Sequence, residues 1–152
     1  LKQYNLRWYL IATRHRDEVE GKVYSLALDR ILKMEPNQHI PYKECGIDFG
    51  VYFENVVGIT KPDGAEPIWV KLRIDKGEYP YIESKPIHTS QDELEESDTD
   101  EKYSYISLYV LDNYELRSKI LSYGSKVTVM KPKSLRDKIV HELKKSLENY
   151  QD

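Results

Sequence analysis

Arginine and tyrosine side chains recur near the start of the chain at positions where they could bind a phosphate-bearing ligand. A guanidinium group can bind a phosphate through two parallel hydrogen bonds, and a tyrosine ring can stack on a base while its hydroxyl group hydrogen-bonds. Because side chains alternate along a strand, Arg7 and Tyr9 would share one strand face. The sequence therefore predicts one ligand site made of Arg7, Tyr9, Arg14 and Arg30.

A β-hairpin would hold these four residues. Residues 6–13 and 22–31 are rich in aromatic, aliphatic and β-branched side chains, and a charged turn joins them. Trp8 and Leu10 alternate with the arginine and the tyrosine, and we expect them in the core of a small barrel. The alternative for the polar face is an ordinary solvated rim, in which Asp29 pairs with a neighbour.

A second group of basic and aromatic side chains follows from alternation in two longer strands. Residues 68–74 and 103–111 each place apolar side chains on one face. The opposite face would carry aromatic rings flanked by bases, as in sheets that stack RNA nucleotides. Trp and Tyr also concentrate in protein interfaces, and on sequence alone we favour an interface with another subunit or with the barrel. This face comprises Trp69, Lys71, Arg73, Tyr105 and Tyr109, with Lys126 and Thr128 expected on the last strand.

No group of residues predicts catalysis. His88 lies near Ser90, and His15 lies near Asp17, but neither pair has a third orienting group or a nucleophile elbow. The histidines and the cysteine lack the close pairing of a zinc site, and no glycine-rich phosphate loop is present. We therefore expect a binding protein and no enzyme, with no catalytic residue, no metal and no cofactor.

The charge is unevenly distributed along the chain. The formal net charge is -3, yet residues 1–34 carry seven bases against four acids, and residues 117–145 carry nine against two. Residues 92–101 hold seven acids and no base. The single cysteine, Cys45, excludes an intramolecular disulfide and fits a reducing cytoplasm. No apolar run approaches ~18 residues, so we expect no membrane partner.

Taken together, several segments resemble the WYL family of bacterial transcription regulators and the extension, often called WCX, that follows its WYL domain. The segments are residues 5–11 with the Trp-Tyr-Leu triplet, 28–31 with Leu-Asp-Arg-Ile, 86–91, 115–124 and 127–136. The resemblance implies a sensing region in which basic and aromatic residues of the barrel bind nucleic-acid fragments or nucleotides. Many members carry an arginine where this chain has Tyr24. We therefore expect a less basic pocket than is usual in the family.

The resemblance and the order of the predicted elements indicate the same α+β fold class. Strand, helix, strand, strand, helix, strand is the order of a ferredoxin-like unit. An amphipathic C-terminal helix follows, with Ser134 and Asp137 as its expected capping pair. The predicted division is residues 1–45 as the C-terminal part of a WYL Sm-like barrel, 46–60 as a bridging helix, and 61–152 as a ferredoxin-like WCX extension.

The expected function is ligand sensing and dimerisation in a bacterial transcriptional regulator. The ligand would be a nucleic-acid fragment, with single-stranded DNA first, or a nucleotide. The helix-turn-helix domain at the N-terminus of such regulators would lie outside this chain. We expect a homodimer because the strand over residues 6–13 would present an open edge. The alternative is a purely structural oligomerisation module that binds no small ligand, and an unassigned hydrolase ranks third.

Overall fold

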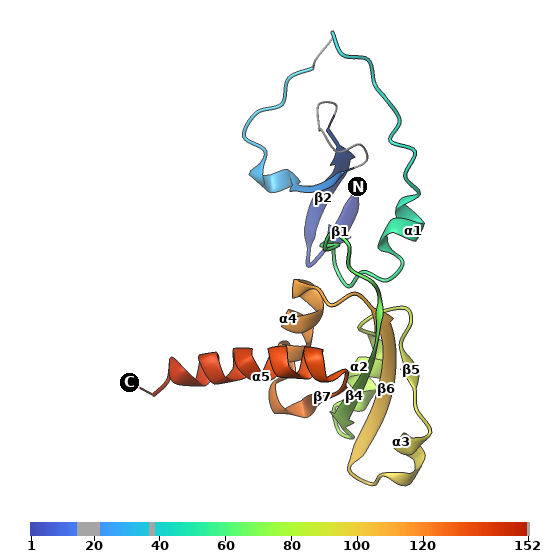
Figure 1. Ribbon diagram of the computed structural model, residues 1–152, viewed down its shortest axis with the longest axis vertical. Helices are drawn as coiled ribbons and strands as arrows, with labels where there is room; N and C mark the ends of the chain where they lie inside the picture. Colours follow the sequence, from blue (N-terminus) through green and yellow to red (C-terminus); the bar gives the residue numbers. More distant parts are fainter. Residues whose placement is uncertain (15–21, 37–38, 152) are drawn as a thin grey trace. The chain divides into compact units, whose positions relative to one another are not determined.

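The computed structural model describes residues 1–14, 22–36 and 39–151 of the chain (Figure 1). The chain divides into two compact units, Leu1–Glu54 and Asn55–Asp152, which we call unit 1 and unit 2 and describe separately. Except for Arg14, the charged turn predicted between the first two strands, including His15 and Asp17, lies outside the described residues.

Unit 1 is built on a three-stranded antiparallel sheet. Its central strand is β2 (Arg7–Thr13), with β1 (Lys2–Tyr4) on one side and β3 (Val23–Ala27) on the other. The predicted hairpin of β2 and β3 is therefore confirmed, whereas β1 was not expected. The open edge predicted for residues 6–13 is wrong, because β2 has a hydrogen-bonded neighbour on both sides.

A two-residue turn at Asn5 and Leu6 folds β1 back onto β2. Both residues have positive φ angles, 47° and 63°, as a type I′ turn requires. Asparagine tolerates this conformation, but a leucine there costs about 1–2 kcal/mol because its Cβ crowds the following carbonyl oxygen. Leu6 is almost fully exposed. Burial of its side chain therefore does not offset this cost.

No described residue of unit 1 is buried. Trp8 is 49% exposed and Leu10 is half-buried, so the prediction that both lie in a barrel core is wrong. A single three-stranded sheet provides no second layer that could bury its apolar face. β3 is followed by a 3₁₀ turn, η1 (Leu28–Arg30), and then by the short helix α1 (Phe49–Phe53), within the region where a helix was predicted.

Unit 2 contains a four-stranded sheet in the order β5-β6-β4-β7, and all neighbouring strands are antiparallel. Together the two units give a mixed architecture with two antiparallel sheets and helices. The strands are β4 (Ile68–Asp75), β5 (Asp92–Glu93), β6 (Tyr103–Val110) and β7 (Val127–Lys131). The helices are α2 (Tyr79–Ser84), α3 (Glu96–Thr99), α4 (Tyr114–Ser122), η2 (Gly124–Lys126) and α5 (Lys133–Glu148).

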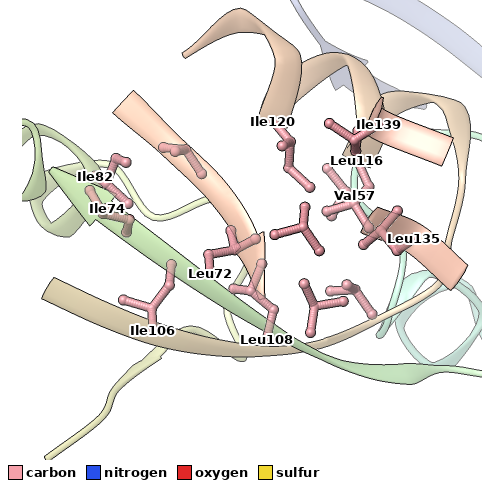
Figure 2. Close-up of a cluster of buried hydrophobic side chains, with 14 residues drawn as sticks. Val57, Leu72, Ile74, Ile82, Ile106, Leu108, Leu116, Ile120, Leu135 and Ile139 are labelled. Atoms are coloured by element: carbon pink, nitrogen blue, oxygen red, sulfur yellow. The ribbon is translucent and has the colours of Figure 1, made fainter. Parts of the chain in front are cut away.

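Alternate side chains of β4 and β6 form the core of unit 2. Leu72 and Ile74 from β4, and Ile106 and Leu108 from β6, are fully buried. Side chains from α2, α4 and α5 pack on the same side of the sheet (Figure 2). The labelled helix residues there are Ile82, Leu116, Ile120, Leu135 and Ile139. The alternation predicted from the sequence is therefore confirmed, and it directs the remaining side chains of both strands to the opposite face.

Two serine hydroxyl groups extend the short edge strand β5. The backbone N–H of Tyr109 donates to Ser90 Oγ at 2.9 Å, and that hydroxyl lies 3.2 Å from the Tyr109 carbonyl oxygen. Likewise, the N–H of Tyr105 donates to Ser97 Oγ at 2.7 Å, and that hydroxyl lies 3.2 Å from the Tyr105 carbonyl oxygen. His88 Nδ1 lies 2.8 Å from Ser90 Oγ and accepts the Ser90 N–H. His88 and Ser90, which lie close together in the sequence, therefore have a structural role: Ser90 hydrogen-bonds the backbone of β6, and His88 holds Ser90.

Asn113 ties the segment before β4 to the start of α4. It is 1% exposed, and its Oδ1 accepts the N–H of Leu116 at 2.8 Å, which confirms the predicted N-cap. Its Nδ2 donates to the carbonyl oxygens of Val57 and Thr60, both at 2.8 Å. One side chain therefore satisfies three backbone groups, two of them in buried hydrogen bonds.

The terminal helix α5 begins differently from the prediction. Pro132 occupies the N-cap position, and its carbonyl oxygen accepts the N–H of Arg136. Asp137 forms an ion pair with Lys133 at 2.8 Å. The predicted capping pair of Ser134 and Asp137 is therefore wrong, because the helix already includes Ser134.

The apolar stripe of α5 is buried only in the first half of the helix. Leu135 and Ile139 belong to the core, whereas Leu143 is 48% and Leu147 is 57% exposed. Among the described residues, no helix combines the length and apolar character needed to cross a bilayer.

Asn113→Ala should lower the free energy of unfolding of unit 2 by about 2–4 kcal/mol. The change removes a helix cap and leaves two carbonyl groups without their donor. Chemical denaturation followed by circular dichroism measures the effect. The control is Asp48→Ala, because Asp48 caps the exposed helix α1 through the N–H groups of Gly50 and Val51; we expect that variant to lose about 1 kcal/mol or less. A loss below about 1 kcal/mol for Asn113→Ala would contradict this account.

Candidate functional site

The four residues predicted to form a ligand site in unit 1 do not share one surface. Arg7 and Tyr9 lie on the same face of β2, and the Arg7 guanidinium pairs with Asp29 at 3.1 Å. The Arg14 guanidinium stacks on the Tyr24 ring at 4.2 Å. Tyr24 is opposite Ala12 in the strand register, and Ala12 alternates with Arg7 and Tyr9, so Arg14 lies on the other face. Arg30 is exposed in η1.

This arrangement fits the alternative reading of a solvated rim, in which Asp29 pairs with a neighbour. Tyr24, the position where many WYL members carry an arginine, provides the ring on which Arg14 stacks. Unit 1 therefore has separate basic positions among its described residues, and one of them is already paired with a carboxylate.

The β4 and β6 residues of the second predicted surface share one face of the unit 2 sheet, the face that α2, α4 and α5 leave uncovered. We call it the tyrosine face. Trp69 lies opposite Tyr109 in the strand register, and Arg73 lies opposite Tyr105. Trp69 is 66% exposed, while the tyrosines and both bases of β4 are half-buried. The tyrosine face comprises Trp69, Lys71 and Arg73 of β4, Tyr103, Tyr105, Ser107 and Tyr109 of β6, and Thr128 and Lys131 of β7.

Aromatic rings hold the side chains of this face in place. The Trp69 and Tyr109 rings lie 4.9 Å apart at an interplanar angle of 36°. The Arg73 guanidinium lies 4.3 Å from the centre of the Tyr103 ring, and Lys71 Nζ lies 5.1 Å from that of Tyr105. Such cation–π contacts fix the cations without neutralising them. Among the described residues, no carboxylate lies within ion-pairing distance of the Arg73 guanidinium.

Acidic residues approach the tyrosine face from the part of the chain that begins with β5 and leads to β6. We call residues 92–101 the acidic segment. Glu96 Oε1 lies 2.5 Å from Lys71 Nζ, and the Tyr105 hydroxyl donates to Asp100 Oδ2 at 2.8 Å. The other Asp100 oxygen accepts the N–H groups of Lys102 and Tyr103. The acidic segment therefore contacts the tyrosine face at two polar groups.

These contacts shift three pKa values in consistent directions. The hydrogen bond from Lys71 lowers the pKa of Glu96, and the N–H of Lys102, followed by the Tyr105 hydroxyl, lowers the pKa of Asp100. The hydrogen bond to Asp100 raises the pKa of Tyr105. At neutral pH both carboxylates are therefore charged and the tyrosine hydroxyl retains its proton.

Strand parity alone missed one base of the tyrosine face and misplaced another. The sheet register shifts between Lys71 and Leu72, so Lys131 lies opposite Lys71 where uninterrupted alternation would place Met130. Tyr103 lies on this face by the predicted alternation with Tyr105 but was not among the predicted site residues, and Arg73 stacks on its ring. Lys126 is not on the last strand, since it lies in η2 and pairs with Asp75 at 3.2 Å. No residue pattern in the sequence indicates the bulge.

A second polar region lies between α4 and α5. It surrounds a hollow of about 420 Å³ lined by Arg117, Asp137, Lys138, His141 and Glu142. Asp112 forms ion pairs with both Arg117 and Lys138 at 2.5 Å, so the charges of these two bases of the hollow are already neutralised. Within the described ranges, no cluster of three or more His, Cys, Asp or Glu residues could hold a metal ion.

Comparison with known proteins finds a match to one protein-family model. No curated protein matches the chain. The family model described as the WCX domain matches residues 66–147, more than half of the chain. The match extends from the residue pair before β4 into the last turn of α5, and it includes every strand of the tyrosine face. The chain therefore belongs to the WCX domain family, as its resemblance to the extension of WYL regulators predicted.

Proposed function

We propose that this chain is part of the sensing region of a bacterial WYL-type transcription regulator, and that its tyrosine face binds single-stranded nucleic acid. The protein would act in the cytoplasm by binding, without chemistry and without a cofactor. The WCX match supports a regulator of this type. The proposal also includes a partial Sm-like barrel in residues 1–45, a bridging helix in 46–60 and a ferredoxin-like unit in 61–152. The strand order β5-β6-β4-β7 with antiparallel neighbours supports the last of these assignments.

The composition of the tyrosine face carries the proposal. The β4 and β6 positions on this face hold aromatic, basic and hydroxyl side chains and one acid, Asp75, which pairs with Lys126; none of them is aliphatic. Interfaces are also rich in Trp, Tyr and Arg, but their cores are poor in lysine, so Lys71 and Lys131 favour a ligand over a subunit contact. Single-stranded nucleic acids bind to rings that stack bases beside cations that contact phosphates. The pair of Trp69 and Tyr109, followed by Lys71, Arg73 and Lys131, provides both.

Unit 1 can supply further phosphate contacts. Arg7, Tyr9, Arg14 and Arg30 remain candidates for this role, although they lie on different faces and Arg7 already has a carboxylate partner. For this reason we assign the stacking surface to unit 2.

Binding can regulate transcription only if the ligand prefers one arrangement of the regulator over another. We propose that the regulator is a homodimer whose paired helix-turn-helix domains read two operator half-sites. A nucleic-acid fragment on the tyrosine face would then favour one of two arrangements of those domains.

Trp69→Ala should weaken the binding of a short fluorescein-labelled oligothymidine by about 1–3 kcal/mol, because it removes one stacking ring. Fluorescence anisotropy measures the affinity. The matched control is Tyr114→Ala, since Tyr114 is 70% exposed on α4 and lies off the sheet. We expect the control to bind like the unchanged chain.

Equal affinities for Trp69→Ala, Tyr114→Ala and the unchanged chain would contradict a stacking role. If Trp69→Ala instead shifts the monomer–dimer balance in sedimentation and leaves oligothymidine binding intact, then the tyrosine face is a subunit interface.

The second candidate function is a structural module that dimerises a regulator and binds no small ligand. The exposed half of α5 favours it, because Val140, Leu143 and Leu147, with Tyr150 just after the helix, follow a three- and four-residue spacing typical of helix pairing. Such a stripe usually packs against a partner.

Leu147→Lys should lower the dimer fraction in sedimentation at micromolar concentration, because it places a charge within the apolar stripe. Val51→Lys is the control, since Val51 is 67% exposed on α1 in the other unit. If both variants sediment like the unchanged chain, α5 does not contribute to dimerisation.

A further inference from the structure

Carboxylates of the acidic segment contact polar groups that a phosphate would also use. Lys71 donates to Glu96 at 2.5 Å, and the Tyr105 hydroxyl donates to Asp100 at 2.8 Å. Lysine and hydroxyl donors bind phosphate oxygens through the same kind of charge-assisted hydrogen bond. We propose that the acidic segment is an intramolecular competitor on the tyrosine face, which single-stranded nucleic acid must displace from Lys71 and Tyr105. This inference rests on the proposed function of the face.

The acidic segment is anchored independently of its contact with Lys71. Lys76 Nζ donates to the carbonyl oxygens of Ser97 and Asp100, at 3.3 and 2.7 Å. The Ser97 hydroxyl group bonds both backbone groups of Tyr105. The Glu96 side chain can therefore leave Lys71 while the segment stays in place. Its side chain is 56% exposed against 25% for Lys71, so rotation into solvent uncovers the lysine and desolvates nothing.

The charge of the acidic segment strengthens the competition. The segment carries seven acids, and two of them, Glu96 and Asp100, contact a face that has three bases, Lys71, Arg73 and Lys131. Lys131 lies close enough to help lower the pKa of Glu96. Phosphates that approach within roughly 8–10 Å at physiological salt would meet this negative charge before they reach the cations. A polyanion with many phosphates can overcome such repulsion through several contacts at once, whereas a single nucleotide cannot.

The test compares Glu96→Gln with Asp98→Asn in the full chain. Each change removes one negative charge from α3, but Asp98 is exposed and, in the described part of the chain, has no ion pair with the tyrosine face. Binding of labelled oligothymidine is measured by anisotropy at several salt concentrations. Glu96→Gln should tighten binding about twofold to fivefold, the range for one partly exposed ion pair. It should also steepen the log–log salt dependence, by at most about 0.7, since no Glu96 carboxylate is then released to take up cations when Lys71 turns to a phosphate.

Asp98→Asn should leave the salt slope unchanged. In a Lys71→Met background, Glu96→Gln should give no further gain, because the two residues act on one contact. Thermal denaturation confirms that each variant is folded.

Each remaining outcome is decisive. If Glu96→Gln and Asp98→Asn tighten binding equally at an unchanged slope, the segment only repels phosphates in general, and the competitor is refuted. If Glu96→Gln binds like the unchanged chain, the competition is absent while the proposed function stands. If neither the unchanged chain nor the Glu96→Gln variant binds oligothymidine, the proposed function fails together with this inference.

Discussion

Burial of alternate side chains in β4 and β6 is the constraint on which unit 2 depends. Leu72, Ile74, Ile106 and Leu108 are fully buried under α2, α4 and α5. Since neighbouring side chains point to opposite faces, each core residue directs the next one to the tyrosine face. The strict antiparallel register then places Trp69 beside Tyr109. A one-residue slip would exchange the two faces, so the stability of the core and the geometry of the surface are set together.

The short pairing of β5 along the edge of β6 determines the path of the chain that follows. β5 pairs through only two residues, and the hydroxyl groups of Ser90 and Ser97 satisfy the backbone groups beside it. A full-length strand there would keep the following residues extended in the sheet. Because pairing stops early, the chain can turn into α3 and bring Glu96 and Asp100 against the bases and tyrosines of the face. The short edge strand therefore determines where the acidic segment lies.

Local patterns in the sequence predicted much of unit 2 and little of unit 1. Alternation and the N-cap residue Asn113 are local signals, and both were confirmed. The turn that adds β1 has Leu6 at a position where glycine is the usual signal, so it was missed. Pro132 displaced the predicted cap of α5, and a bulge brought Lys131 onto the tyrosine face. The contact of Glu96 with Lys71 joins residues far apart in the sequence, which periodicity cannot reveal.

Intrinsic fluorescence tests most directly whether the tyrosine face binds nucleic acid. The chain has two tryptophans, Trp8 in unit 1 and Trp69 in unit 2, so Trp8→Phe and Trp69→Phe each leave one reporter. Bases that stack on a tryptophan quench its emission. If the account is correct, oligothymidine quenches the Trp8→Phe protein, which reports from Trp69, and leaves the Trp69→Phe protein unchanged. Quenching only in the Trp69→Phe protein would place the ligand on unit 1 and contradict the account.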